Sequence, residues 1–407
     1  MSQENVDEVD EDVVLNAEDI VQVIDLGEND GVASDSDDDY DGGDDENEME
    51  VGAEGDAIKE DSALVFRGHK DSVFTVKIDP KSSSLAVTGS QDDTAIVWNI
   101  STGDTLFTCT GHTDSVTSVG FSYDSSYVAT ADMSGLIKVW KTETKEEIWS
   151  FEGGETEWLR WHPLANVLLV GTNDGDVWMW KIPDGDCKTF HHNSSVTSSN
   201  ILSDGKRLCT GCEDGSLKFW DLKSGESIYS LSGHDSHKSS VLSIDSHSDG
   251  KLVLTGSTEQ TAKLINTQTG KVITTFDCSS PTEGDNSEDE NSVETVGLSN
   301  MFPYAATGCM NGIVGVWDIP SQTLRHQCKH EAGVVKLKWD NVSPMIYTAC
   351  LDGVIRLWDA RTSSTVSTWE GHTAEILDFD ISKDGSTIVS VAEDQTARVF
   401  SVHSPDR

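Results

Sequence analysis

The sequence predicts an all-β fold: an eight-bladed β-propeller that follows a disordered acidic tail. Three observations support this prediction. One short pattern recurs eight times along the chain, at intervals of 40 to 52 residues. The last copy of the pattern lacks a strand, whereas a strand without a neighbour stands before the first copy. The first 60 residues carry 24 acidic residues and one lysine, a composition that opposes the formation of a core.

Each copy consists of a turn, a strand of alternating residues and a final aromatic or apolar residue, as in "NDGDVWMWK" and "LDGVIRLWD". Gly-His pairs precede several copies, among them Gly68-His69 and Gly371-His372. A period near 40 residues with these features is typical of four-stranded propeller blades. The final residues of the eight copies are Trp98, Trp140, Trp180, Trp220, Ile265, Trp317, Trp358 and Phe400.

The string "SALVFRGH" begins at residue 62 and reads as one strand followed by Gly-His. Only acidic sequence precedes it, and a strand without a neighbour leaves its backbone N–H and C=O groups unpaired. The eighth repeat stops soon after its third strand, Ala397–Phe400. We therefore expect the strand at 62–67 to pair with 397–400 and to close the ring, which spans residues 61–402.

Charge is distributed unevenly along the chain, whose net charge is −44. Residues 1–60 form the predicted acidic tail, and residues 279–292, "SSPTEGDNSEDENS", form a predicted acidic loop inserted between strands. Ser34, Ser36 and Ser287 stand beside acidic residues and are candidate sites for acidophilic kinases. Both the tail and the body repel phosphate, so we expect no direct binding of nucleic acid, and a basic protein or peptide is the complementary partner.

The cysteines and the start of the chain predict an intracellular protein. The eight cysteines accompany an acidic N-terminus, the opposite of a secretory signal. The expected location is the cytoplasm, with the nucleus and the cell periphery as further options. No stretch reaches 18 consecutive apolar residues, so we expect no transmembrane segment. Cys209 and Cys212 are expected to face opposite sides of a strand, which argues against a metal or redox role.

The repeated Gly-His and Trp-Asp elements resemble the WD40-repeat family over residues 62–401. In that family the histidine bonds an aspartate and the tryptophan packs beside them. Because such a set recurs at the blade period, we expect it to support the blades rather than to catalyse a reaction. We expect the remaining repeats to be held by apolar packing alone. The complete sets are His69, Asp92 and Trp98; His192, Asp214 and Trp220; and His330, Asp352 and Trp358.

No phosphate loop, zinc-protease motif or nucleophile elbow is present in the sequence, so we expect no enzymatic activity, no cofactor and no metal. The resemblance instead implies a peptide-binding face on the side of the Gly-His loops. The centre of this face is expected at a pocket between the eighth and the first repeat. The residues that the resemblance places on the face are Phe74, Gln91, Trp158, Glu213, Glu294, Leu351, Glu375, Leu377 and Glu393.

Longer strings such as "LAVTGSQDDTAIVW" and "LDGVIRLWDARTSS" resemble an animal branch of this family that is linked to vessel growth and cell migration. That branch is similar to a fungal propeller that acts as a dedicated chaperone for one basic ribosomal protein of the large subunit. The resemblance thus implies a monomeric escort for a basic ribosomal protein. The alternative is an intracellular scaffold that acts in cell migration and angiogenesis through small-GTPase signalling. A ubiquitin-ligase receptor is disfavoured because no F-box-like helix pair is present.

Overall fold

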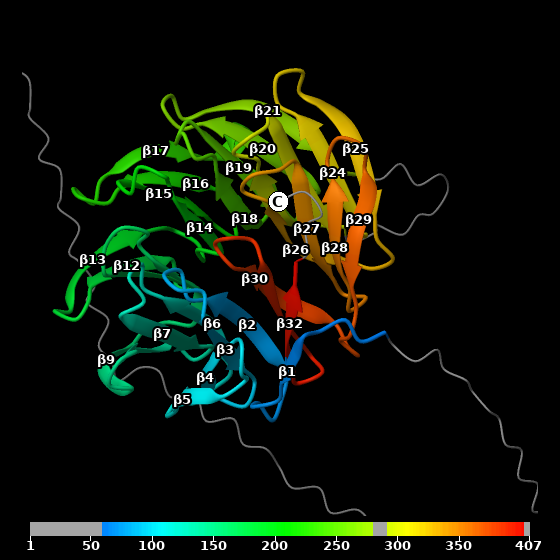
Figure 1. Cartoon of the computed structure of the whole chain (residues 1–407). Coiled ribbons are helices and arrows are strands. Elements are labelled where there is room, and N and C mark those ends of the chain that lie inside the picture. The colour runs from blue at the N-terminus through cyan, green and yellow to red at the C-terminus, as the bar shows by residue number, and fades with distance from the viewer. Residues whose placement is uncertain (1–58, 280–290, 403–407) are drawn as a thin grey trace, which may run out of the picture. The chain divides into compact units, whose positions relative to one another are not determined.

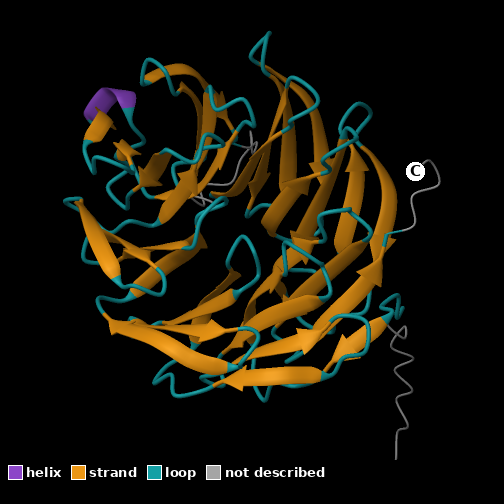
Figure 2. Ribbon diagram, turned by 60° about the vertical axis from the view of Figure 1, so that its left-hand side comes forward, coloured by secondary structure: helices purple, strands orange, loops and turns teal. Residues whose placement is uncertain are grey.

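The computed structural model describes residues 59–279 and 291–402. This part of the chain forms eight antiparallel sheets of four strands each, arranged as the blades of a ring (Figure 1). The prediction of an all-β, eight-bladed propeller is therefore confirmed. One short 3₁₀ helix, Gly233–Asp235 (η1), interrupts the strands and loops (Figure 2). The described residues include no helix with the length and hydropathy needed to cross a membrane.

Blades one to seven each contain four consecutive strands, numbered from β2. Blade one contains β2 (Val73–Ile78), β3 (Leu85–Ser90), β4 (Ala95–Asn99) and β5 (Thr105–Cys109); blade two β6 (Val116–Phe121), β7 (Tyr127–Asp132), β8 (Leu136–Lys141) and β9 (Glu146–Glu152); blade three β10 (Thr156–Trp161), β11 (Val167–Thr172), β12 (Asp176–Lys181) and β13 (Asp186–His191); and blade four β14 (Ser198–Ile201), β15 (Arg207–Gly211), β16 (Leu217–Asp221) and β17 (Ser227–Leu231).

The second half of the ring repeats this arrangement. Blade five contains β18 (Val241–Ser246), β19 (Leu252–Ser257), β20 (Thr261–Asn266) and β21 (Lys271–Asp277); blade six β22 (Val293–Leu298), β23 (Tyr304–Cys309), β24 (Ile313–Asp318) and β25 (Thr323–Lys329); blade seven β26 (Val334–Trp339), β27 (Met345–Cys350), β28 (Ile355–Asp359) and β29 (Ser364–Trp369); and blade eight β30 (Ile376–Ile381), β31 (Thr387–Ala392), β32 (Ala397–Ser401) and β1 (Leu64–Phe66).

Hydrophobic pattern determines the place of each strand in its blade. The second strands, such as β3 with the sequence LAVTGS, are buried along nearly their whole length because neighbouring blades cover both faces. The last strands, such as β21 with KVITTFD, alternate between exposed and partly buried residues. This period of two is expected where one face of a strand meets solvent. The core therefore consists of apolar layers between successive blades.

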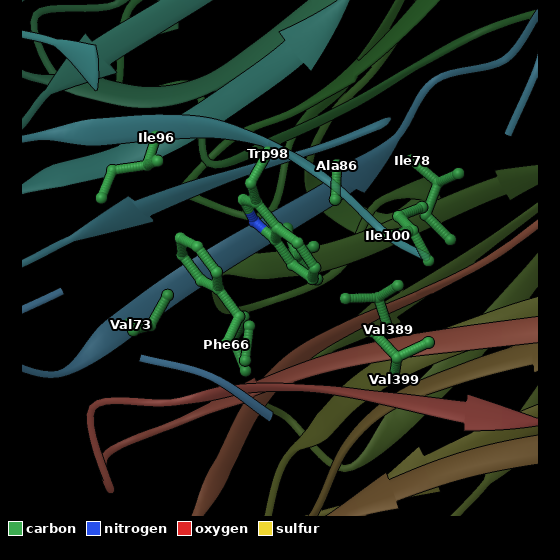
Figure 3. Close-up of a cluster of buried hydrophobic side chains, with 12 residues drawn as sticks. Phe66, Val73, Ile78, Ala86, Ile96, Trp98, Ile100, Val389 and Val399 are labelled. Carbon is green, nitrogen blue, oxygen red and sulfur yellow. The ribbon is translucent and has the colours of Figure 1, made fainter. Parts of the chain in front are cut away.

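The two ends of the described chain meet in blade eight. Strand β1 pairs with β32 in the register Leu64↔Val399 and Phe66↔Ala397, and Figure 1 shows the two strands side by side. The ring of Phe66 stacks on Trp98 of blade one with 4.4 Å between centroids (Figure 3). Strand β1 thus completes blade eight and adds an aromatic side chain to the core that blades one and eight share.

Glu60, predicted as the last residue of the tail, belongs to this closure. Its carboxylate forms an ion pair with Arg398 of β32. The neighbouring Asp61 N–H donates a hydrogen bond of 2.9 Å to the carbonyl oxygen of Glu370, at the end of blade seven. Glu60 and Asp61 therefore both contact the last two blades, Glu60 through its carboxylate and Asp61 through its backbone N–H.

Charged side chains join the first strands of blades seven, eight and one. The Asp378 carboxylate accepts the Val76 N–H at 3.0 Å and pairs with Lys77 at 3.0 Å and with Lys336. Two residues later in β30, Asp380 accepts the Ile78 N–H at 2.8 Å and pairs with Lys338. Buried carboxylates need such partners, and here they tie adjacent blades together.

Several predicted features lie outside the described residues. These are the tail residues 1–58, with Ser34 and Ser36, and most of the predicted inserted loop, with Ser287. Residues 279, 291 and 292 at the two ends of that loop are described, and β22 begins directly afterwards at Val293.

Candidate peptide-binding face

One backbone hydrogen bond in each blade marks a common surface at the start of the first strands. In each case an N–H between the second and third strands donates to a carbonyl oxygen just before the first strand, over 2.9 to 3.0 Å. We call the surface formed by these sixteen residues, together with the bulge residues in the first strands, the Gly-His face. The pairs are Gln91–Ser72, Met133–Ser115, Asn173–Glu155, Glu213–Ser195, Thr258–Ser240, Met310–Ser292, Leu351–Gly333 and Glu393–Glu375.

Eight of the nine residues predicted for binding lie on the Gly-His face. The polar ones, Gln91, Glu213, Glu375 and Glu393, are exposed, and Leu351 is half-buried. The other three, Phe74, Glu294 and Leu377, are half-buried and occupy the bulge where the register with the second strand shifts.

The predicted surface position of Trp158 is wrong. In blade three the bulge lies between Thr156 and Trp158, so Glu157 occupies the bulge position. The Trp158 side chain is 8% exposed, and its indole N–H donates to the Val196 carbonyl oxygen at 2.8 Å in the core between blades. Blade three has no Gly-His to set the register, and the two acids that flank Thr156 are the signal that identifies its face residues.

Because Glu157 takes the bulge position in blade three and Glu155 lies beside it, the Gly-His face is more acidic than predicted. Glu155 accepts the side-chain amide of Asn173 at 2.5 Å, and Glu157 accepts the Ser195 hydroxyl at 3.1 Å. The face therefore carries six glutamates: Glu155, Glu157, Glu213, Glu294, Glu375 and Glu393.

Exposed apolar residues lie among these acids. Met133 is 50% exposed and Met310 is 41% exposed, and both take part in the backbone hydrogen bonds that mark the face. Phe74 of β2 and Leu377 of β30 come from adjacent first strands, since Asp378 beside Leu377 bonds Thr75 beside Phe74. Flexible thioethers and aromatic groups among carboxylates suit a ligand that is both cationic and apolar.

Below the face, a buried histidine holds the loop before the first strand in six of the eight blades. His69 follows the pattern predicted for it: Nδ1 lies 3.1 Å from Asp92, and Nε2 lies 2.9 Å from the Thr88 hydroxyl. The Trp98 ring stacks on Phe66, and its indole N–H takes no part in this hydrogen-bond network. Burial raises the pKa of Asp92, but hydrogen bonds from His69 and Thr94 outweigh it and hold that pKa well below its ordinary value.

In blades four and seven the predicted histidine–aspartate contacts are replaced by contacts to the backbone. Nδ1 of His192 lies 3.2 Å from the Gly175 carbonyl oxygen, and Nδ1 of His330 lies 3.1 Å from that of Gly312. These histidines follow the last buried residue of the preceding strand by two positions, whereas His69 follows Phe66 by three. The shorter connection brings Nδ1 to a glycine carbonyl instead of a carboxylate.

The other members of these two sets also find different partners. Asp214 caps the Ser216 N–H at 2.9 Å, and Asp352 pairs with Arg356 at 2.7 Å. Trp220 and Trp358 donate their indole N–H groups to Thr210 and Thr348, the hydroxyls that also meet the histidines.

Three blades that were expected to depend on apolar packing alone contain a buried histidine–carboxylate pair. The pairs are His112–Asp132 at 3.1 Å, His237–Glu259 at 2.7 Å and His372–Asp394 at 3.0 Å. In blade five the histidine of the Gly-His pair, His234, is exposed within η1, and His237 takes the buried position instead. Because of the extra turn η1, the histidine that pairs with the carboxylate lies three residues after the Gly-His histidine. The Gly-His motif alone does not predict this shift.

The remaining candidate groups do not form a reactive centre. Cys209 and Cys212 are buried in two different apolar clusters, and burial raises the pKa of Cys212 to about 11. The described residues contain no group of three or more histidine, cysteine or acidic side chains arranged to hold a metal ion. Cavities of about 340 to 420 Å³ open at the opposite ends of the first strands, around Trp161, Pro163 and Lys383.

Comparison with known proteins gives a family match and several relatives. The model of the family described as "WD domain, G-beta repeat" matches residues 61–99, 103–141, 185–221, 225–266, 321–359 and 363–401. The human angio-associated migratory cell protein is 46% identical over 354 residues, which cover 86% of this chain and 82% of that protein. The ribosome assembly protein SQT1 of Saccharomyces cerevisiae is 27% identical over 328 residues, which cover 74% of this chain and 73% of SQT1.

A solved structure with the same fold is that of Chaetomium thermophilum Sqt1 bound to the N-terminus of the ribosomal protein L10. It aligns with a TM-score of 0.76 at 24% identity and covers 84% of this chain and 100% of that chain. At this level of identity the likeness is one of fold.

Proposed function

Because this chain belongs to the WD40 repeat family, and within it to the group of the angio-associated migratory cell protein, we propose that it is a non-enzymatic protein-binding propeller that escorts a basic ribosomal protein. The proposed client contact is a basic, partly apolar segment that lies across the Gly-His face. The observation that carries this proposal is the set of six glutamates around exposed methionines on that face.

Two further observations support the choice of a ribosomal client. A relative of the chain is a ribosome assembly protein, and a propeller of the same fold has been crystallised with the N-terminus of the ribosomal protein L10. Ribosomal proteins carry basic segments that bind rRNA, and before assembly these segments need a partner of opposite charge. A surface rich in carboxylates provides that partner and also speeds encounter.

The binding test uses the full chain and a synthetic peptide of the L10 N-terminus. Two variants reverse charge on the Gly-His face: Glu375→Lys with Glu393→Lys in blade eight, and Glu155→Lys with Glu157→Lys in blade three. The matched control reverses two exposed acids on last strands, Glu146→Lys with Asp186→Lys. Each double variant changes the net charge by the same amount, so a difference in affinity between variants depends on where the reversed charges lie. Titration calorimetry at low and moderate salt measures the affinity.

We expect each face variant to weaken binding by at least tenfold, whereas the control retains most of the affinity. Equal losses of affinity in all three variants would mean that general charge attraction, and not the Gly-His face, holds the peptide. Unchanged binding in both face variants would refute the proposed face.

A second candidate function is an intracellular scaffold in cell migration, and the 46% identity to the angio-associated migratory cell protein favours it. Capture of partners by the full chain, identified by mass spectrometry at two salt concentrations, separates the two functions. One dominant basic ribosomal protein that is lost as salt rises supports the escort. A set of signalling or cytoskeletal proteins without a ribosomal client supports the scaffold.

A further inference from the structure

Blade six contains a cysteine where other blades contain the buried histidine. Cys278 follows Phe276 by two residues, just as His192 follows Phe190 in blade four. Its Sγ lies 3.5 Å from the Thr307 hydroxyl, which also accepts the indole N–H of Trp317 at 3.0 Å. The corresponding hydroxyl in blade four accepts Trp220 and meets His192 in the same way. Cys278 therefore occupies the histidine position of its blade.

A second cysteine occupies the position that the histidine's acidic partner takes in blade two. Cys309 follows Thr307 by two residues, as Asp132 follows Thr130 in blade two, where Asp132 pairs with His112 at 3.1 Å. The equivalent positions in blade six place Cys278 and Cys309 on the same side of β23, where Cys278 meets the Thr307 hydroxyl. Both cysteines pack on the same apolar cluster between blades five and six.

The two thiols differ in exposure. Cys278 is half-buried, whereas Cys309 is only 1% exposed. The side chains of Cys309 and Thr307 hold the pKa of Cys278 below its ordinary value, while Cys278 and burial raise the pKa of Cys309. Cys278 is thus the more accessible sulfur for attack on a peroxide, and Cys309 is placed to resolve it.

We propose that Cys278 and Cys309 form a thiol pair that hydrogen peroxide converts reversibly into a disulfide. The Cys278 thiolate attacks one peroxide oxygen, an S–O bond forms, the O–O bond breaks and the departing hydroxide takes up a proton to leave as water. The Cys309 sulfur then attacks the Cys278 sulfenic acid, and the S–O bond breaks as the Cys309 proton and the hydroxyl leave as water. Two thiols and one peroxide give one disulfide and two waters, and a thiol reductant reverses the change.

The disulfide would join the end of β21 in blade five to the end of β23 in blade six. Cys309 directly precedes Met310 of the Gly-His face. Asn291 already bridges the same region, since its amide donates to the Cys278 carbonyl oxygen at 3.4 Å and its own oxygen accepts the Asn311 N–H at 3.2 Å. Oxidation therefore adds a covalent link at a junction that hydrogen bonds now close.

The test treats the full chain with peroxide, blocks remaining thiols and digests it with trypsin and Glu-C. Trypsin alone leaves both cysteines in one fragment, residues 272–325, because no lysine or arginine lies between them. Glu-C cuts after Glu283 and Glu294, so a disulfide links fragments 272–283 and 295–325. We expect this linked pair after peroxide treatment and its disappearance after dithiothreitol.

Two variants and an internal control complete the experiment. In Cys309→Ser the linked pair is absent and Cys278 accumulates as a sulfenic acid that dimedone captures. In Cys278→Ser the buried Cys309 stays reduced. Cys187, an exposed cysteine in blade three, reports that the oxidant has reacted. The proposal is overturned if Cys187 is fully oxidised while both fragments of the native chain are recovered singly, with their thiols blocked.

Discussion

In blades two, four and seven, one threonine hydroxyl of the second strand meets both the histidine and the tryptophan of the blade. In blade four the Thr210 hydroxyl lies 2.8 Å from Nε2 of His192 and 3.1 Å from the indole nitrogen of Trp220. The Gly175 carbonyl can only accept a hydrogen bond, so the proton of the neutral imidazole resides on Nδ1. Nε2 then accepts from the threonine. One buried hydroxyl thus hydrogen-bonds both the imidazole and the indole ring, and neither ring needs a charged partner there.

Blade five provides a direct test of which histidine supports a blade. We expect His237→Ala to lower the free energy of unfolding by about 2–3 kcal/mol, because it removes the buried ring that bonds both Glu259 and Thr255. The neighbouring His234→Ala is the control and is expected to change it by less than ~0.5 kcal/mol, since that ring is exposed. Urea unfolding measures both. Equal losses would contradict the assignment.

The same histidines predict how stability depends on pH. Burial, together with Lys218 beside His192 and Arg356 beside His330, lowers the pKa of each ring to about 4. In the unfolded chain both rings titrate near 6.5. Between these values the unfolded state binds more protons, so stability falls as pH drops from 6.5 to 4, by up to ~3 kcal/mol for each ring.

The measurement is urea unfolding at pH 7.5, 6 and 5. The double variant His192→Gln, His330→Gln is expected to be less stable at pH 7.5 and to show a shallower loss between pH 6.5 and 4. The single variants His192→Gln and His330→Gln are each expected to show part of this change. A slope that is identical in the native chain and the double variant would contradict the pH prediction.

At the scale of elements, the closing strand β1 contributes more than its three residues suggest. It pairs with β32, stacks Phe66 on Trp98 and carries the loop that places His69 in blade one. Because β1 pairs with β32, the sheet of blade eight has all four of its strands. An unpaired edge of β32 would invite association with other chains. The closure is therefore both a packing contact and a protection of the edge.

The closing strand gives the third prediction. We expect Phe66→Ala to cost about 3–5 kcal/mol, the usual range for removing a buried aromatic ring. Deleting residues 62–67 should be at least as costly, because it also unpairs β32. Deleting residues 1–55 is the control and should leave the unfolding midpoint unchanged. Thermal and denaturant unfolding distinguish these cases, and a large loss in the control would assign a structural role to the tail.

At the scale of the whole molecule, charge is the dominant feature. Residues 1–55 contain 22 acidic residues and no basic residue, which is half of the net charge of −44. Basic side chains are few, and three of them, Lys77, Lys336 and Lys338, pair with aspartates along the first strands. These pairs keep cationic groups in the interior of the ring and leave carboxylates on the Gly-His face.

The fourth prediction concerns the rate of association with a basic peptide. Removing residues 1–55 should slow association several-fold, by roughly one order of magnitude at most, in 20 mM salt, because the long-range field is halved. At 1 M salt, where the screening length is about 3 Å, the full and shortened chains should associate at similar rates. Stopped-flow fluorescence measures both. A rate that does not depend on the tail at low salt would confine the attraction to the propeller.

The sequence by itself determined the class of fold and the number of blades. Period, turn residues and terminal tryptophans are local features, and each repeat contains enough of them to identify one blade. The unpartnered strand before the first repeat and the short last repeat likewise stand in the sequence, and Leu64–Phe66 pairs with β32 in the structure. The face positions came from the resemblance to the WD40 family, in which they lie at a constant offset from the first strand.

Only the tertiary structure decided which side chains meet. The histidines of blades four and seven reach a glycine carbonyl instead of Asp214 and Asp352, because a connection one residue shorter shifts the ring. Blade three has no Gly-His from which to count positions, and its bulge lies one residue earlier than predicted. Trp158 is therefore buried. Cys278 and Cys309 are 31 positions apart, and only folding places both on the apolar cluster between blades five and six. Offsets of one residue change a side chain's direction in a strand, and packing between blades selects among them.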